Sequence, residues 1–362
     1  MARAVCAFAC LLLLCSGAAW AAHPGFRTIG IWSDEDRVRL DLCVWYPVRH
    51  PPATVRYGGW LLQVNRRATP LEGPFPLVII SHGSPGNRFA HHNLAASLAG
   101  QGFVVVAPTH QEDNAHNMRH LYTARQLTRR LDEIRQTIAK ICVEPEIGPL
   151  IDPNRIGLIG FDSGGAAALL SIGGRISPAA WEQWKADAPP DAPYLYPWAK
   201  PRLDALAADP SLHHLHAYNR IRCAIVAAPA YSMLFDPASL ARIQAPVMLL
   251  ATEQDPINPA PHRLRTLRDK LPLPPDMALI RGADPIALMA RPEGRSVDVL
   301  PGYADPGAKQ RQQIFDQLNS AVSGFFLRTI GNPNLPPLAP PLPDDAGEIK
   351  PEPAKDAGQR KQ

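Results

Sequence analysis

The sequence predicts an α/β protein in which helices cover both faces of a mostly parallel sheet. Short, continuously apolar runs such as PLVIISHG (76–83) and FVVVAPTH (103–110) are typical of buried parallel strands. They alternate with segments of helical periodicity. In the longest of these, apolar residues recur three or four positions apart: Leu127, Leu131, Ile134, Ile138 and Ile141. Such alternation builds an open sheet whose functional residues gather at the carboxyl ends of the strands.

The remaining elements extend this order along the chain. We expect residues 27–32 and 39–48 to pair as antiparallel strands before the alternation begins. Further strands are predicted at 155–161, 223–230, 245–254 and 277–283, and helices at 88–99 and 164–171. A final helix should begin at Asp305-Pro306, an N-cap followed by proline, and bury Ile314, Leu318, Val322 and Phe325.

The two ends of the chain differ in composition from the part between them. Residues 1–22 have a basic start, a short apolar run and small residues near Ala21, which is typical of a cleavable signal peptide and too short for a membrane span. Residues 332–362 are rich in proline, and we expect a disordered tail whose partner is unknown. An α/β domain then covers residues 23–331, with a Pro- and Trp-rich insertion at about 176–218 that we interpret as a lid.

Charge and cysteine content exclude several classes of function. Loss of the signal peptide removes Arg3 and no acidic residue, which lowers the net charge from +4 to +3. So small a charge predicts no nucleic-acid or membrane partner. The remaining cysteines, Cys43, Cys142 and Cys223, allow at most one disulfide, whose pairing the sequence leaves open, and lack the spacing of a metal site. We expect no cofactor.

The stretch IGLIGFDSGG (156–165) joins a predicted strand to a predicted helix through small residues. A sharp turn of this kind presents a nucleophile when the residues two before and two after it are small. If the turn is centred on Asp162, those positions hold Gly160 and Gly164, whereas centring it on Ser163 would place the bulky Phe161 at the earlier one. The spacing therefore predicts that the turn presents Asp162.

In the order and content of its segments the chain resembles the α/β-hydrolases of the dienelactone hydrolase type, which are related to platelet-activating-factor acetylhydrolase. The resemblance covers residues 24–328. It is carried by PGFRTIGI, VWYP, PLVIISHGSPGNRFAHHNLAASLAGQGFVVVAPTH, IDPNRIGLIGFDSGG, APAYSMLFDPASLARIQAPVMLLATEQDPINP and LNSAVSGFF. It implies the α/β-hydrolase fold and hydrolysis of esters or lactones by a Ser-His-Asp triad.

Two of the three triad positions that the resemblance implies have changed. The family's GHSxGG is GFDSGG in this chain, so Asp162 stands in the serine position, while Asp255 matches the acid. The histidine position holds Pro285. The triad order places histidine last, and no histidine follows His262.

The oxyanion hole implied by the same resemblance is better retained. It would use backbone N–H groups near Gly83, Ser84 and Ser163. The positive end of the helix that follows Asp162 should also keep that carboxylate ionised. Asp162 could equally satisfy these donors itself.

Three other arrangements remain open. Asp162 could attack a saturated carbon, as aspartates of dehalogenase- and epoxide-hydrolase-like members do, or a lid histidine such as His214 could act as base. Asp162, Asp255 and Asp284 could converge on a hard cation. A metal-dependent site could also form from His110, Asp113, His116 and His120, with the last two on one helix face.

The sequence thus predicts a periplasmic or secreted α/β-hydrolase-fold protein that has lost triad catalysis. We expect it to bind a small acyl or aromatic ligand beneath the lid, or a partner. The alternative is an active hydrolase with an atypical site.

Overall fold

The structure is a computed structural model. It describes residues 22–33, 38–187, 199–213, 215–255, 264, 267–272, 274–293 and 306–332. The predicted signal peptide up to Ala21, the tail after Asn332 and the centre of the predicted lid lie outside these residues, as do His214 and His262. Within the described part, no helix is long and apolar enough to cross a membrane.

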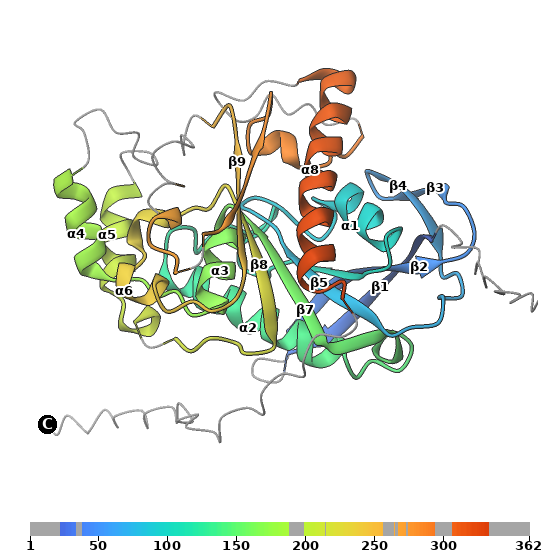
Figure 1. Ribbon diagram of the computed structural model, residues 1–362, viewed down its shortest axis with the longest axis horizontal. Helices are drawn as coiled ribbons and strands as arrows, with labels where there is room; N and C mark the ends of the chain where they lie inside the picture. Colours follow the sequence, from blue (N-terminus) through green and yellow to red (C-terminus); the bar gives the residue numbers. More distant parts are fainter. Residues whose placement is uncertain are drawn as a thin grey trace, which may run out of the picture.

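A ten-stranded sheet runs through the molecule in the order β10-β9-β8-β7-β5-β6-β2-β1-β4-β3 (Figure 1). Its strands are β1 (His23–Trp32), β2 (Arg39–Val48), β3 (Ala53–Tyr57), β4 (Trp60–Arg66), β5 (Phe75–Ser81), β6 (Val104–Pro108), β7 (Ile151–Phe161), β8 (Ile221–Ala227), β9 (Val247–Thr252) and β10 (Asp276–Ile280). Neighbouring strands from β6 to β10 pair in parallel, whereas β2 is antiparallel to both β1 and β6. The predicted α/β class with a mostly parallel sheet is confirmed.

Helices cover both faces of this sheet. They are α1 (His92–Ala99), α2 (Ala124–Ile141), α3 (Ser163–Ser171), α4 (Pro178–Asp187), α5 (Lys200–Ala208), α6 (Pro237–Leu240) and α8 (Gly307–Thr329). Alternate residues of β5 show the two faces. Leu77 and Ile79 pack with α2 and α3, while Val78 and Ile80 pack with α1 and α8. The predicted apolar stripes of α2 and α8 are buried.

Several boundaries differ from the predictions. The helix predicted from residue 88 begins at His92, and the strands β3 and β4 were not expected. They form a hairpin around Gly58, whose φ of 57° suits a residue without a side chain. The final helix begins at Gly307 after Pro306, and Asp305 lies outside the described residues.

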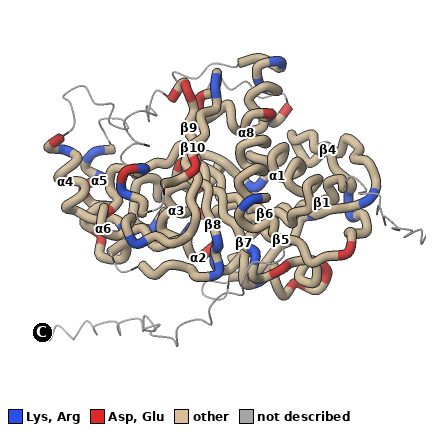
Figure 2. Tube along the Cα trace, in the orientation of Figure 1, with Lys and Arg blue, Asp and Glu red and all other residues tan. Residues whose placement is uncertain are grey.

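The described parts of the predicted lid include α4 and α5, which lie at the opposite end of the molecule from β3 and β4 (Figure 1). Their role as a lid stays a prediction. Basic and acidic residues are interspersed along the described chain (Figure 2), in keeping with the small net charge. Cys43, Cys142 and Cys223 are free thiols.

Candidate active site

The turn between β7 and α3 has the geometry of a nucleophile elbow centred on Asp162. Asp162 has φ 51° and ψ −115°, a strained conformation for a residue with a side chain. A Cβ added at Gly160 would overlap the carbonyl of Gly164, and one added at Gly164 would overlap the carbonyl of Ser81. Small residues are therefore required at the two positions that the sequence singled out.

The Asp162 carboxylate is held by neighbours from the predicted oxyanion hole. Its Oδ2 accepts the backbone N–H of Ser84 at 2.9 Å and the hydroxyl of Ser163 at 3.2 Å. Gly83 lies against it, since a Cβ there would come 2.8 Å from the Asp162 Cβ. Burial raises the pKa of Asp162, while the backbone N–H groups of Ser84 and Ser163 oppose that rise. The net direction is opposite to the one expected from the helix dipole.

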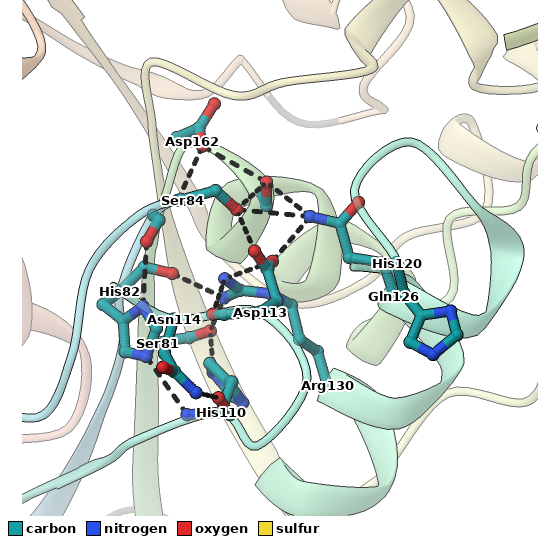
Figure 3. Close-up of polar contacts among 12 residues, drawn as sticks. Ser81, His82, Ser84, His110, Asp113, Asn114, His120, Gln126, Arg130 and Asp162 are labelled. Carbon is teal, nitrogen blue, oxygen red and sulfur yellow. Dashed lines mark hydrogen bonds and ion pairs between the residues drawn. The ribbon is translucent and has the colours of Figure 1, made fainter. Parts of the chain in front are cut away.

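A buried polar network lies beneath Asp162 (Figure 3). The Ser84 hydroxyl donates to Asp113 Oδ1 at 2.5 Å and lies 3.0 Å from the hydroxyl of Ser163. Gln126 donates from Nε2 to Asp113 Oδ2 at 2.5 Å and accepts the hydroxyl of Tyr231 at 2.8 Å. Ser84 is thus hydrogen-bonded to Asp113 on the loop after β6, and Ser163 to Gln126 on α2.

Arg130 supplies the positive charge of this network. Its Nη2 lies 2.6 Å from Asp113 Oδ2, and both side chains are almost fully buried. Burial alone would raise the pKa of Asp113, but the Arg130 charge and hydrogen bonds from Gln126 and Ser84 hold it at about 2. The Arg130 guanidinium also donates to the carbonyl of His82, which fixes the loop that carries Ser84.

Ser81, His110 and Glu133 form a second buried set of hydrogen-bonded side chains. They are connected like a catalytic triad but are not accessible to a substrate. Nε2 of His110 lies 2.9 Å from the hydroxyl of Ser81, and Nδ1 lies 2.7 Å from Glu133 Oε2. All three residues are at most 2% exposed. Burial raises the pKa of Glu133 to about 7 and lowers that of His110 well below its usual value. Because Ser81 is inaccessible, this chain is structural.

Sequence reasoning missed Gln126, Arg130 and Glu133, although a signal was present. Together with Thr137, these residues recur four, three and four positions apart. Each one directly precedes a residue of the apolar stripe of the same helix, and all four are buried. A polar stripe at helical spacing beside an apolar one would have indicated a second, hydrogen-bonded buried face.

The predicted histidine position lies in a capped turn. Pro285 has helical angles, φ −59° and ψ −31°, at the start of a short 3-10 turn, Ile286–Leu288. The preceding Asp284 accepts the N–H of Ala287 on Oδ1 at 2.7 Å, as an N-cap does. Burial raises the pKa of Asp284. The described residues of this turn include no histidine.

The other predicted site residues, Asp255 and Asp284, follow the neighbouring strands β9 and β10, and Gln254 N–H donates to Ala283 O at 2.8 Å just before them. Asp255 is buried at 8% exposure just after β9, next to residues that are not described. Among the described residues, Asp162, Asp255 and Asp284 form no group that could hold a metal, so the cation site proposed for them is wrong. No histidine of the described chain hydrogen-bonds to Asp162.

The metal site proposed on the loop after β6 is also wrong. His110 is held by Ser81 and Glu133, and Asp113 by Arg130. His116 and His120 do not share a helix face, because α2 begins only at Ala124, where Thr123 caps it. Instead, Nε2 of His120 lies 3.6 Å from Oε2 of Glu112.

Comparison with known proteins agrees with this geometry. Residues 65–180 match the model of the dienelactone hydrolase family. A ferulic acid esterase from Streptomyces cinnamoneus has a similar structure, with a TM-score of 0.58 and 18% identity over 91% of this chain and 95% of the esterase. The chain has the α/β-hydrolase fold.

Dienelactone hydrolase from Anabaena variabilis ATCC 29413 aligns with this chain at a TM-score of 0.48 and 14% identity, over 85% of this chain and 99% of that one. No curated protein matches the sequence. In this fold a strand-to-helix turn presents the nucleophile, and the assignment of Asp162 to that position stays a prediction.

Proposed function

We propose that this protein is an exported relative of the dienelactone hydrolases that no longer turns over esters or lactones and instead binds a small ligand. One observation carries the proposal. The side chain at the nucleophile position is the Asp162 carboxylate, and it accepts the Ser84 N–H that would otherwise stabilise an oxyanion. A resting anion in that place competes with the charge that develops during acyl transfer.

The chemistry of acyl transfer supports the same conclusion. Attack of the Asp162 carboxylate on an ester would form an anhydride, which lies uphill of the ester. Hydrolysis of an intermediate then needs a base to activate water. Pro285 cannot serve as that base, and its backbone is held in a capped turn. The attack on the ester therefore lacks a suitable nucleophile, and the hydrolysis of the intermediate lacks a base.

A second candidate function follows from the retained elbow. Asp162 is only partly buried and keeps the strained geometry that exposes a nucleophile. A carboxylate in this geometry could displace a leaving group from a saturated carbon of a haloalkane or an epoxide and form an ester. Without a base, the ester would persist, and the protein would react once.

The test uses the mature chain beside Asp162→Asn, which keeps the size of the side chain. We expect p-nitrophenyl acetate and γ-butyrolactone to be hydrolysed by both proteins at the same slow rate, without multiple turnover. Steady turnover by the unmodified chain that Asp162→Asn abolishes would contradict the proposal. A mass increase on the Asp162 peptide after treatment with a haloalkane or an epoxide would support the second candidate.

Export is proposed from residues 1–22 alone. When the full chain is expressed in a bacterium with a periplasm, N-terminal sequencing of the periplasmic protein should begin at Ala22 or His23. Recovery of the uncleaved chain from the cytoplasm would contradict this part of the proposal.

A further inference from the structure

A cavity of about 330 Å³ lies next to the loop that follows Ser84. Its walls come from the β3–β4 hairpin, the loop after Ser84, the segment around His116 and residues 286–293. Neither Asp162 nor any residue of the network beneath it lines this cavity. It is therefore separate from the polar cluster, although Pro85 and Ile286 on its wall adjoin Ser84 and Pro285.

From this cavity we infer a binding site for a neutral, single-ring aromatic molecule that carries a carbonyl or hydroxyl group. The inference rests on the proposed function and deepens it, because it names the ligand class and the cavity that would hold the ligand.

The walls of the cavity are held together without a ligand. Three backbone hydrogen bonds join its separate segments: Ala290 N–H to Ala90 O at 2.7 Å, Glu293 N–H to Gly59 O at 2.6 Å, and Ala115 N–H to Gly86 O at 3.0 Å. A preformed cavity is the usual form of a small-molecule site, because little ordering is needed on binding.

The volume limits the size of the ligand. An apolar protein cavity of about 150 Å³ binds benzene. The cavity in this protein has about twice that volume, which suits one ring with a substituent of a few atoms.

The lining favours an aromatic ring. Trp60 is half-buried at the wall, and its ring is held in place by stacking on Phe89 at 5.8 Å between centroids. Met289 and Ile286 face the same space, and a methionine sulfur packs well against an aromatic ring. Indole, thioether and aliphatic groups together offer a flat, polarisable and largely apolar surface.

The polar groups of the lining suit an oxygen on that ring. Oδ1 of Asn87 accepts the N–H of Phe89 at 2.8 Å, so its amide nitrogen is the atom that can donate to a ligand oxygen. The exposed imidazole of His116 lines the rim and can donate or accept. These groups suit one carbonyl or hydroxyl.

The charges near the cavity balance one another. Glu293 forms an ion pair with Arg56 at 2.6 Å between Oε2 and Nη2. Arg291, which also lines the cavity, has an interaction of its own within the protein. A charged ligand would lose hydration without gaining a matching partner, which favours a neutral one.

The experiment uses the mature chain and ¹⁹F NMR of 4-fluoroacetophenone, a neutral aryl ketone that cannot be hydrolysed. We expect saturable line broadening, with affinity at least tenfold lower in Trp60→Ala and in Met289→Trp, which fills the cavity. Trp32→Ala is the control, because Trp32 is 62% exposed on β1 and does not line the cavity; its affinity should be unchanged. Thermal unfolding checks each variant, and if Trp60→Ala does not fold, Met289→Trp decides.

Charged analogues test the ligand class. We expect 4-fluorobenzoate and 4-fluorobenzylammonium to bind at least tenfold more weakly than the ketone. Lack of saturation up to the solubility of the ketone, equal affinity in the folded variants, or equal affinity for either ion would overturn the inference. Its failure is distinct from failure of the proposed function, which steady turnover of 4-fluorophenyl acetate would contradict whether or not the ketone binds.

Discussion

The elbow at Asp162 and the loop at Pro285 differ in what their backbones present. At the elbow the backbone keeps the strained shape that presents a side chain, and the required glycines remain. At the loop, a capped 3-10 turn stands where an imidazole would be expected. The comparison teaches that the close packing around Gly160 and Gly164 by itself requires the sharp turn at Asp162. The shape of this turn is thus evidence for fold rather than for activity.

The largest effect should come from the charge beneath the elbow. Arg130→Met leaves the buried Asp113 carboxylate without its cation, and we expect a loss of about 3–5 kcal/mol in the free energy of unfolding. Urea denaturation measures this loss. Adding Asp113→Leu to Arg130→Met should recover part of it, because no unpaired charge then remains. A loss below about 1 kcal/mol in the single variant would show that the network does not support the elbow.

The elbow glycine itself should come next. Gly160→Ala introduces a Cβ that overlaps the backbone of α3, so we expect a loss of about 3 kcal/mol in the free energy of unfolding. Gly58→Ala is the matched control, since Gly58 has positive φ but no atom within 4 Å of an added Cβ; it should lose only about 1 kcal/mol. Similar losses in the two variants would contradict the steric account.

The next prediction concerns the buried Ser81–His110–Glu133 chain rather than the elbow. Its contribution to the free energy of unfolding should depend on pH. The pKa of Glu133 is raised from 4.5 to about 7, so its native state binds the proton more tightly than the unfolded chain. Its stabilising contribution is complete below pH 4.5 and is lost as pH rises through 7. Glu133→Gln should therefore remove up to about 3 kcal/mol from the change in the free energy of unfolding with pH.

The measurement compares the free energies of unfolding of the two proteins from pH 4.5 to 7.5. Only the difference between them is informative, because buried neutral histidines such as His110 contribute with the opposite sign. Relative to the variant, the unmodified protein should be more stable at pH 4.5 than at pH 7.5. A constant difference would contradict the raised pKa of Glu133.

The smallest effect should come from the Pro285 loop. Pro285→Ala keeps the Asp284 cap and only frees the φ angle, so we expect a loss of about 0.4–1 kcal/mol in the free energy of unfolding. Asp284→Ala should lose about 1 kcal/mol, because it removes the cap. Thermal and urea unfolding measure both. A larger loss for Pro285→Ala than for Gly160→Ala would reverse the comparison between the two regions.

The sequence by itself determined the class of fold and the centre of the elbow. Periodicity along the chain sets which faces are apolar, and the spacing of Gly160 and Gly164 selects Asp162 over Ser163. The same local reasoning failed for His116 and His120, since Thr123 starts α2 beyond them. It also missed the β3–β4 hairpin, whose strands are short and lie at the edge of the sheet.

The tertiary structure alone decided what surrounds Asp162. That Ser84 donates to this carboxylate, and that Arg130 neutralises Asp113 below it, depends on contacts between residues 17 to 78 positions apart. The triad-like chain of Ser81, His110 and Glu133 likewise unites a strand end, a loop and a helix. Local sequence patterns fix which residues are buried, but hydrogen bonds among buried polar groups depend on how the elements pack, and packing is set by the whole chain.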